Sequence, residues 1–347
     1  MRLAFGIGLA LSCALGLAAC GAMGSEEREG VRAVGSSTVY PFAAAVAEEL
    51  AKIHPELDSA FVLSTGTSEG IRQFCEGVGL STPDIVNASR RMTRAEYAKC
   101  QANGVDEIIE LQVGLDGIVF ATARDGGIAM ELTPQMIYEA LAAKPYGEAQ
   151  DARTWSAVDS SLPAEPIEVY GPPPTSGTRD ALQELVLKTG CEANGRLGGT
   201  KLAEPARFDT LCTELRADGA YIAQGEHDDM TVAKLPDNPE ALAIFGYSYF
   251  EENTDKVRAL PVGGIEPTYD TIASGRYPAA RPLYLYVKKA HLDLVPGLRP
   301  YLEQWARSWG KDGPLTRIGL VAASERMQAL NRRAIANLEP MNAAVLQ

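Results

Sequence analysis

The sequence predicts an α/β fold built as two lobes. Three times along the chain, a β-like run is followed by a turn rich in Gly, Ser and Thr and then by an amphipathic helix. This alternation is typical of mostly parallel sheets flanked by helices. Two longer apolar segments, 107–123 and 242–250, lie where a chain could cross from one lobe to the other and return. The chain is long enough to build two hydrophobic cores.

The N-terminal segment predicts export. Arg2 precedes an apolar stretch at 3–17 that is short and rich in small residues, as is typical of a signal peptide over 1–19. The sequence LAACG at 17–21 resembles a bacterial lipobox and implies cleavage before Cys20 and lipidation of that cysteine. The alternative is an ordinary signal peptide with an incidental cysteine. Residues 20–30 are small and charged, and we expect them to form a flexible tether.

The first of the three units begins at Val31. Its β-like run leads into the sequence GSST at 35–38, and a helix is expected to follow from Tyr40. Pro41 falls in the first helical turn, where its missing N–H costs little. The residues spaced to face inward along this helix are Phe42, Val46, Leu50 and Ile53.

The second unit has a strand at 61–63, the sequence STGTS at 64–68 and then a helix. Its expected inward residues are Ile71, Phe74, Cys75 and Val78.

The third unit has a strand at 167–170, the sequence GPPPTSGT at 171–178 and a helix that ends at Gly190. A further strand is expected at 282–289. In parallel sheets, ligands collect beyond the carboxyl ends of the strands, so the three turns are expected to face one cleft. The inward residues of this third helix are Leu182, Leu185 and Val186.

Four cysteines follow the lipobox, and an even number in an exported chain favours disulfides. Four cysteines allow three pairings. We favour Cys75–Cys100 and Cys191–Cys212 because each pair closes a short loop. A metal site is the alternative, but the sequence has no Cys-x-x-Cys and few histidines.

Hydroxyl residues at helix starts predict an anion-binding site. The first N–H groups of a helix lack internal partners, and the helix dipole adds partial positive charge there. Ser and Thr hydroxyls supply further donors, although these residues also favour helix starts simply as N-caps. Three such turns in one exported α/β chain favour a binding cleft. The residues concerned are Ser36, Ser37, Thr67, Ser68, Thr175 and Ser176.

Other classes of function fit the sequence less well. The Gly-Lys-Ser/Thr of a nucleotide loop is absent from all three turns. A serine hydrolase would need a general base, and the whole chain has three histidines. The formal net charge of −13 argues against binding to nucleic acid. We therefore expect a protein that is not an enzyme and needs no cofactor or metal.

Four segments carry a resemblance to a known family. In this order and spacing they resemble the PstS family, the periplasmic phosphate-binding components of phosphate ABC transporters. The resemblance implies a two-lobed periplasmic-binding-protein fold (type II-like), with two mixed sheets flanked by helices and two chain crossings. The implied lobes are 31–122 plus 248–347, and 123–247. The segments are GSSTVYPF (35–42), STGTSEGIRQFCEG (64–77), DIVNASRRM (84–92) and YGPPPTSGT (170–178).

The resemblance also implies a ligand set, with one departure from the family pattern. Family members often carry a carboxylate, which accepts the proton of hydrogen phosphate, where this chain has Arg90, and an arginine where it has Pro172. Asp84, Asp116 and Asp180 are candidate replacements for the carboxylate. The implied ligand-binding residues are Ser37, Thr38, Thr67, Ser68, Ser89, Arg90, Ser176, Gly177 and Thr178.

The resemblance implies a solute-binding lipoprotein that captures inorganic phosphate for the membrane permease of an ABC importer. We expect a monomer in the periplasm or at the cell surface, held to the membrane through its lipid anchor. One alternative is a sensing or partner-binding lipoprotein with the same fold. Another is a general binder of tetrahedral oxyanions such as sulfate, because Arg90 replaces an acceptor with a donor.

Overall fold

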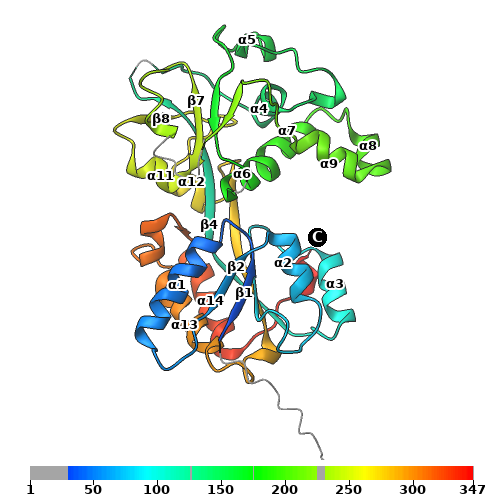
Figure 1. Ribbon diagram of the computed structural model, residues 1–347, viewed down its shortest axis with the longest axis vertical. Helices are drawn as coiled ribbons and strands as arrows, with labels where there is room; N and C mark the ends of the chain where they lie inside the picture. Colours follow the sequence, from blue (N-terminus) through cyan, green and yellow to red (C-terminus); the bar gives the residue numbers. More distant parts are fainter. Residues whose placement is uncertain (1–29, 126, 175, 225–230, 347) are drawn as a thin grey trace, which may run out of the picture.

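Two long strands connect two α/β lobes in the computed structural model of the protein. These strands, β4 (Ile108–Ala123) and β9 (Ala280–Lys288), run between the lower and upper lobes of Figure 1. The predicted two-lobed α/β fold is confirmed. The predicted signal peptide and Cys20 lie outside the described residues, which are 30–125, 127–174, 176–224 and 231–346.

Lobe 1, the lower lobe in Figure 1, contains both ends of the described chain and the amino-terminal part of β4. Its other elements are β1 (Arg32–Gly35), α1 (Tyr40–Ile53), β2 (Phe61–Ser64), α2 (Thr67–Phe74), β3 (Ile85–Ala88), α3 (Arg94–Ala102), β9, η3 (Lys289–His291), α13 (Leu298–Ser308), η4 (Pro314–Ile318), β10 (Val321–Ala322), α14 (Glu325–Asn337) and η5 (Ala343–Val345).

Lobe 2, the upper lobe, is formed by the middle of the chain and the end of β4. Its other elements are α4 (Pro134–Leu141), η1 (Pro145–Gly147), α5 (Trp155–Val158), β5 (Val169–Gly171), α6 (Gly177–Ala181), the π-helix η2 (Leu182–Leu187), α7 (Lys188–Glu192), α8 (Gly198–Ala203), α9 (Pro205–Thr213), β6 (Tyr221–Ala223), β7 (Leu242–Gly246), α11 (Tyr247–Glu252), β8 (Val257–Ala259) and α12 (Tyr269–Ala273).

One strand, β4, belongs to the sheets of both lobes. The strand order is β2-β1-β3-β9-β4-β7-β5-β6, with β8 and β10 also paired to β4. The pairs β1–β2, β1–β3, β5–β6 and β5–β7 are parallel, whereas every pair formed by β4 or β9 is antiparallel. The sheets are therefore mixed, and the antiparallel part is the part that connects the lobes.

The apolar sequence of β4 follows from this central position, because a strand covered on both faces needs apolar residues on both. In lobe 1, Phe42 of α1 and Trp305 of α13 belong to one buried cluster. Phe74 of α2 and Cys100 of α3 belong to a second cluster that also includes Tyr286 of β9. A third and larger cluster fills lobe 2.

The second long strand predicted, at 242–250, is wrong in its latter part. β7 ends at Gly246 and α11 begins at Tyr247. The alternating aromatic residues resemble a strand pattern, but Tyr247 and Phe250 lie three residues apart on one side of the helix, with ring centroids 6.3 Å apart.

The chain returns to lobe 1 through β9 rather than through 242–250. After α11 the chain stays in lobe 2, since β8 pairs with the end of β4 at 121–123. Gly117 of β4 then faces Ala280 of β9, while Ile118 faces Gly246 of β7. We therefore propose lobe boundaries near 117/118 and 279/280, in place of the sequence-based 122/123 and 247/248.

Two residues expected to face inward do not. Ile53 is 46 % exposed and Val78 is 42 % exposed. Ile53 is the last residue of α1, and Val78 lies beyond the end of α2 at Phe74, so neither is covered by the sheet. The other residues expected to face inward from these two helices are buried.

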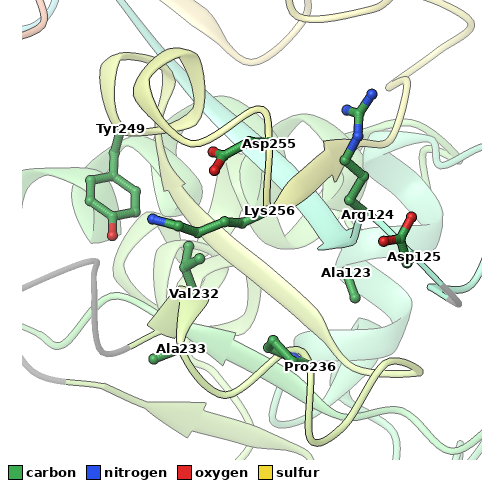
Figure 2. Close-up of a pocket in the computed structure, with 9 residues that line it drawn as sticks. All are labelled: Ala123, Arg124, Asp125, Val232, Ala233, Pro236, Tyr249, Asp255 and Lys256. Atoms are coloured by element: carbon green, nitrogen blue, oxygen red, sulfur yellow. The ribbon is translucent and has the colours of Figure 1, made fainter.

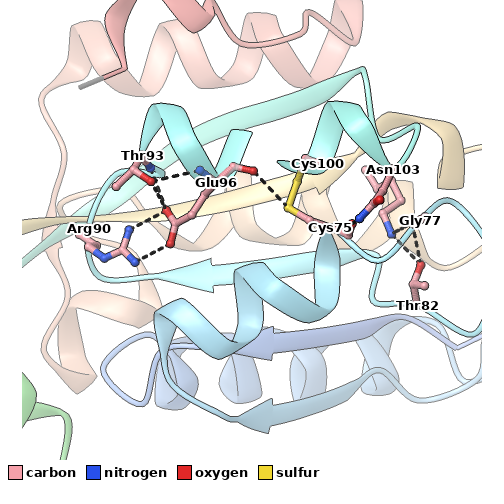
Figure 3. Close-up of a disulfide and its surroundings, with 9 residues drawn as sticks. Cys75, Gly77, Thr82, Arg90, Thr93, Glu96, Cys100 and Asn103 are labelled. Atoms are coloured by element: carbon pink, nitrogen blue, oxygen red, sulfur yellow. Dashed lines mark hydrogen bonds and ion pairs between the residues drawn. A yellow bond between two sulfur atoms is a disulfide. The ribbon is translucent and has the colours of Figure 1, made fainter. Parts of the chain in front are cut away.

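Both predicted disulfides are present. Cys75–Cys100 joins the residue after α2 to α3, as Figure 3 shows, and Cys191–Cys212 joins α7 to α9. Each bond links two consecutive or nearby helices of one lobe, and all four cysteines are buried. The disulfides therefore stabilise each lobe internally and leave the lobes free to move relative to one another.

Replacing Cys191 and Cys212 together by Ser is expected to lower the free energy of unfolding by about 3 kcal/mol, because the unfolded chain regains the entropy of a loop with a separation of 21 residues. Urea denaturation of the oxidised protein measures the change. The reduced wild-type protein serves as the control and should lose at least as much. Equal midpoints for the oxidised wild type and the variant would contradict the prediction.

Candidate anion-binding site

Three turns of lobe 1 meet at one edge of its sheet. β1 is parallel to both β2 and β3, so the carboxyl ends of the three strands lie together. The turns that follow these strands are 36–38, 65–66 and 89–91. The structure thus brings the first two hydroxyl-rich turns and the NASR segment to one place.

Backbone contacts hold these turns closely together. The Gly66 amide donates to the Gly35 carbonyl at 2.8 Å, and the Ser36 amide donates to the Asn87 carbonyl at 2.9 Å. A Cβ atom on Gly70 would lie 2.6 Å from Cα of Gly35. The start of α2 therefore packs against β1 at a distance that only glycine permits.

The start of α6 in lobe 2 reaches the first of these turns. Ser37 Oγ donates to Asp180 Oδ2 at 2.9 Å, and Thr38 Oγ1 donates to the Gly177 carbonyl at 3.3 Å. A Cβ atom on Gly177 would lie 2.7 Å from both the backbone nitrogen and Oγ1 of Thr38. The third predicted turn therefore faces the other two across the junction between the lobes.

Several of the predicted ligand hydroxyls also have structural partners. Ser176 Oγ accepts from the Thr178 amide at 3.2 Å and caps the N-terminus of α6. Thr67 Oγ1 lies 3.0 Å from Ser89 Oγ and accepts from the Ser89 amide at 3.1 Å. An accepting hydroxyl keeps its own proton, so Ser176 both caps the helix and remains able to donate to an anion.

Arg90 does not present an open fork. Its Nη1 and Nη2 donate to the two carboxylate oxygens of Glu96 at 2.9 and 2.8 Å, and Nη2 also donates to Ser68 Oγ at 2.9 Å. Figure 3 shows this fork and the capping box that Glu96 forms with Thr93 at the start of α3. The sequence analysis missed Glu96, although Thr93-x-x-Glu96 is the pattern of a capping box.

The Arg90–Glu96 pair is ionised at neutral pH. Burial alone would raise the pKa of Glu96, but hydrogen bonds from Arg90 and from Thr93 outweigh it and hold that pKa below its usual value. The hydrogen bonds with Glu96 raise the pKa of Arg90, against the opposing effect of burial. Glu96 therefore fixes Arg90 beside Ser68 and offsets most of its charge.

The three carboxylates considered as acceptors have different surroundings in the structure. Asp84 is fully buried before β3, at the opposite edge of the sheet from the turns. Asp116 lies on β4 with its Oδ2 3.8 Å from Nε of Arg281; burial raises the pKa of Asp116, and the charge of Arg281 opposes this. Asp180 contacts a predicted ligand residue directly, through the bond from Ser37.

The sequence analysis missed Arg281, the second residue of β9. Its side chain is 2 % exposed, and Nη2 donates to Thr38 Oγ1 at 2.6 Å and to the Gly177 carbonyl at 3.1 Å. Nη1 donates to Glu184 at 3.0 Å. The strand was expected to begin only at residue 282, and no local pattern marks the arginine before it, because its partners come from other parts of the chain.

The chain was also judged to lack the Gly-x-Ser-x-Gly pattern of a serine hydrolase, and this was wrong. Residues 66–70 read Gly-x-Ser-x-Gly between a strand and a helix, the pattern of a hydrolase nucleophile elbow. The serine is Ser68, whose hydroxyl accepts from Arg90. His54 contacts Glu56, His291 is buried against Asp84, and His227 lies outside the described residues. Neither described histidine therefore serves Ser68 as a general base.

A separate cavity of about 440 Å³ lies in lobe 2 (Figure 2). Its two basic side chains have other partners: Lys256 Nζ donates to Asn253 Oδ1 at 2.9 Å, and Arg124 donates to the Thr254 carbonyl at 2.7 Å. It contains none of the predicted ligand residues. Its lining residues are Ala123, Arg124, Asp125, Val232, Ala233, Pro236, Tyr249, Asp255 and Lys256.

Metal and membrane sites were also sought in the described parts of the chain. There, no three or more His, Cys, Asp or Glu side chains are grouped so that they could hold a metal ion. None of the helices described is both long and apolar enough to cross a membrane.

The fold and the turns together define a class of binding protein. Residues 21–309 match the family model described as a PBP superfamily domain, so the chain belongs to the PBP superfamily.

Two curated relatives and one solved structure place the chain more closely. It is 31 % identical over 319 residues to Protein SphX of Synechococcus elongatus, a match that covers 88 % of this chain and 83 % of the relative. It is 28 % identical over 311 residues to the phosphate-binding protein PstS of Staphylococcus saprophyticus, covering 87 % and 85 %.

The solved structure is described as a possible phosphate binding protein from Planctomyces limnophilus, with 27 % identity and a TM-score of 0.69; the match covers 88 % of this chain and 97 % of that one. The resemblance to the PstS family is confirmed by these matches. Both of these relatives are named as binding proteins, which agrees with the prediction that the chain is not an enzyme.

Glu96→Gln is expected to lower the free energy of unfolding at pH 7 by about 1–2 kcal/mol, because the amide loses charge-assisted hydrogen bonds. The folded-state pKa of Glu96 is depressed, so its stabilisation is complete above the unfolded pKa and is lost as the pH falls through the folded value. The difference between wild type and variant should therefore shrink below about pH 4.

Urea denaturation at pH 7, 5 and 3.5 measures this difference. Glu76→Gln is the matched control, since Glu76 forms an exposed ion pair with Arg72 on α2 and should change stability little at any of these values. A Glu96→Gln deficit that stays constant down to pH 3.5 would rule out the ionised pair as its cause.

Proposed function

We propose that the protein captures inorganic phosphate between its two lobes and delivers it to the membrane permease of an ABC importer. The observation that carries this proposal is the meeting of turns from both lobes at the Thr38–Gly177 contact. These turns supply hydroxyls and helix-start N–H groups, which are the donors that a tetrahedral oxyanion needs. The phosphate-binding names of relatives in the same superfamily support this choice of anion.

The charges at the site explain how an acidic chain can bind an anion. The chain has a formal net charge of −13, so attraction must come from local donors rather than from the overall field. Arg90 and Arg281 both lie at the turns, but each is paired with a carboxylate. Binding therefore depends mainly on N–H and hydroxyl groups fixed in position, which lose little entropy when the anion arrives.

Asp180 orients a replacement for the acceptor carboxylate that family members often carry where this chain has Arg90. The replacement is the hydroxyl oxygen of Ser37. An ionised carboxylate can only accept, so the Ser37 hydroxyl donates its hydrogen bond to Asp180. The lone pairs of Ser37 Oγ are then left to accept from other donors. Hydrogen phosphate carries a proton to donate there, whereas sulfate at neutral pH carries none. This arrangement favours phosphate over sulfate.

The predicted cellular placement is consistent with this function. We propose that residues 1–19 are a signal peptide, that Cys20 is lipidated and that residues 20–30 tether the binding protein to the membrane. The tethered protein would act as a monomer in the periplasm or at the cell surface, because the proposed site is built from turns of one chain.

Ser176→Ala and Arg90→Ala are each expected to weaken phosphate binding. Ser176→Ala loses one neutral hydrogen bond, about fivefold in Kd. Arg90→Ala leaves the negative charge of Glu96 unpaired beside the proposed site, where it repels the anion, and should raise the Kd about tenfold or more. Isothermal titration of the ligand-free chain from residue 25 onward, first with phosphate, measures both. Arg91→Ala is the matched control, since the neighbouring Arg91 pairs with Glu110 instead.

The wild type should bind phosphate in the micromolar range or tighter. No heat from wild type with phosphate would contradict the proposed function. Tight binding by the wild type with unchanged affinity in both variants would instead contradict the assignment of the site.

Asp180→Asn is expected to lower the ratio of phosphate to sulfate affinity by about tenfold or more, because the amide NH2 group can donate to Ser37 Oγ, whose own proton can then be donated to either anion. Competition titrations of both anions with both proteins measure the ratio. Asp209→Asn, which removes an exposed carboxylate of the same lobe, is the control. A ratio that Asp180→Asn leaves unchanged would show that the acceptor is another group.

A further inference from the structure

Arg281 touches both lobes at once. It lies on the crossing strand β9, directly opposite Asp116 of β4 in the sheet register. Its Nη2 donates to Thr38 of lobe 1 at 2.6 Å and to the Gly177 carbonyl of lobe 2 at 3.1 Å. Its Nη1 donates to Glu184 of lobe 2 at 3.0 Å. A single guanidinium thus links the crossing strands to the facing turns of the two lobes.

These contacts depend on the lobes being together. If lobe 2 rotates away about β4 and β9, the Gly177 carbonyl and Glu184 move with it, and two of the acceptors leave the guanidinium. A buried guanidinium without acceptors is costly, so opening must bring water to Arg281. With the lobes together, its side chain is 2 % exposed and Nη1 and Nη2 are bonded.

Arg281 also contacts two of the residues predicted to bind the ligand. Thr38 and Gly177 are both predicted ligand residues, and Arg281 donates a hydrogen bond to each of them from the crossing strand β9. Since the Thr38 hydroxyl proton goes to the Gly177 carbonyl at 3.3 Å and its lone pair accepts from Arg281, this hydroxyl is committed to the contact between the lobes.

We infer that Arg281 is a positioning residue that holds the two lobes closed over the bound anion. It sets Thr38 and Gly177 at the separation at which the turns of both lobes bind one ligand, and it adds a positive charge behind them. This role rests on the proposed phosphate-binding function. This role requires an arginine because its planar fork reaches acceptors of both lobes at the same time, whereas the single nitrogen of a lysine ammonium does not have this forked geometry.

The inference predicts an effect on the release of phosphate. We call the hydrogen bonds of Arg281 to Thr38, Gly177 and Glu184 the latch. Closure holds the ligand after it has bound, so loss of the latch should mainly raise the rate of dissociation. Arg281→Met, which keeps an unbranched apolar stem but removes the guanidinium, is expected to raise the dissociation rate and the Kd about tenfold or more, with association changed less than threefold. Arg281→Lys is expected to recover part of this loss.

The experiment compares Arg281→Met with Arg276→Met, an exposed arginine in the turn just before β9, as the matched control. Stopped-flow release of phosphate gives the dissociation rate, and urea denaturation gives stability. A variant that is less stable but releases phosphate at the wild-type rate would show a merely structural role and overturn the inference.

A second variant covers the case in which Arg281→Met does not fold. Glu184→Gln removes only the lobe 2 carboxylate, which is 37 % exposed, and leaves the arginine in place. It should raise the dissociation rate about threefold or more, and a wild-type rate would count against the latch.

Small-angle X-ray scattering separates failure of the inference from failure of the proposed function. If the wild type binds no phosphate, the proposed function fails, but the latch is still tested on the proteins without ligand. Arg281→Met should then have the larger radius of gyration, because fewer molecules are closed, and equal radii would overturn the inference.

Discussion

The pairing of β4 with strands of both lobes is the constraint on which the rest of the structure depends. Its first part pairs with β9 through Gly117, and its last part pairs with β7 and β8 from Ile118 onward. Both sheets therefore take their register from one continuous strand. The lobes cannot slide past one another, and the motion left to them is rotation about the two crossing strands.

That restriction determines where a ligand can be held. The parallel strands β1, β2 and β3 end at one edge of the sheet of lobe 1, and β5 of lobe 2 leads into the turn before α6. Because rotation about β4 and β9 keeps these two edges facing, each closure returns the same turns to the same contact. The close approach of Gly177 to Thr38 shows how little tolerance this contact has: one added Cβ atom would lie 2.7 Å from Thr38 atoms.

Most of the fold could be predicted from the sequence because local patterns encode it. Helical spacing, hydroxyl-rich turns, the apolar run of β4 and two short cysteine loops each act within about 25 residues. What the sequence did not reveal depends on long-range contacts. Arg281 acquires its role from Thr38 and Glu184, which lie 243 and 97 residues away. The end of β7 at Gly246 was missed because alternating aromatic residues fit a strand and a helix equally well.

The candidate site shows the same division. The turns were identified by residue type, but the state of each side chain was not. Arg90 was expected among the ligand-binding residues, and the structure shows it bonded to Glu96, so its charge is fixed in position and largely neutralised. In the proposed site, recognition of the anion thus depends on oriented hydroxyl and N–H groups more than on full charges.

This dependence couples recognition to closure. A site of neutral donors attracts an anion weakly until donors from both lobes surround it, so the anion binds the closed arrangement much better than the open one. A ligand can shift a conformational equilibrium only by this difference in affinity. Ser37 bonds to Asp180 and Thr38 to Gly177 across the same junction, so the bonds that we propose to select the anion also hold the lobes together. In the proposed site, selectivity and closure therefore depend on one group of contacts, and a substitution in that group should change both.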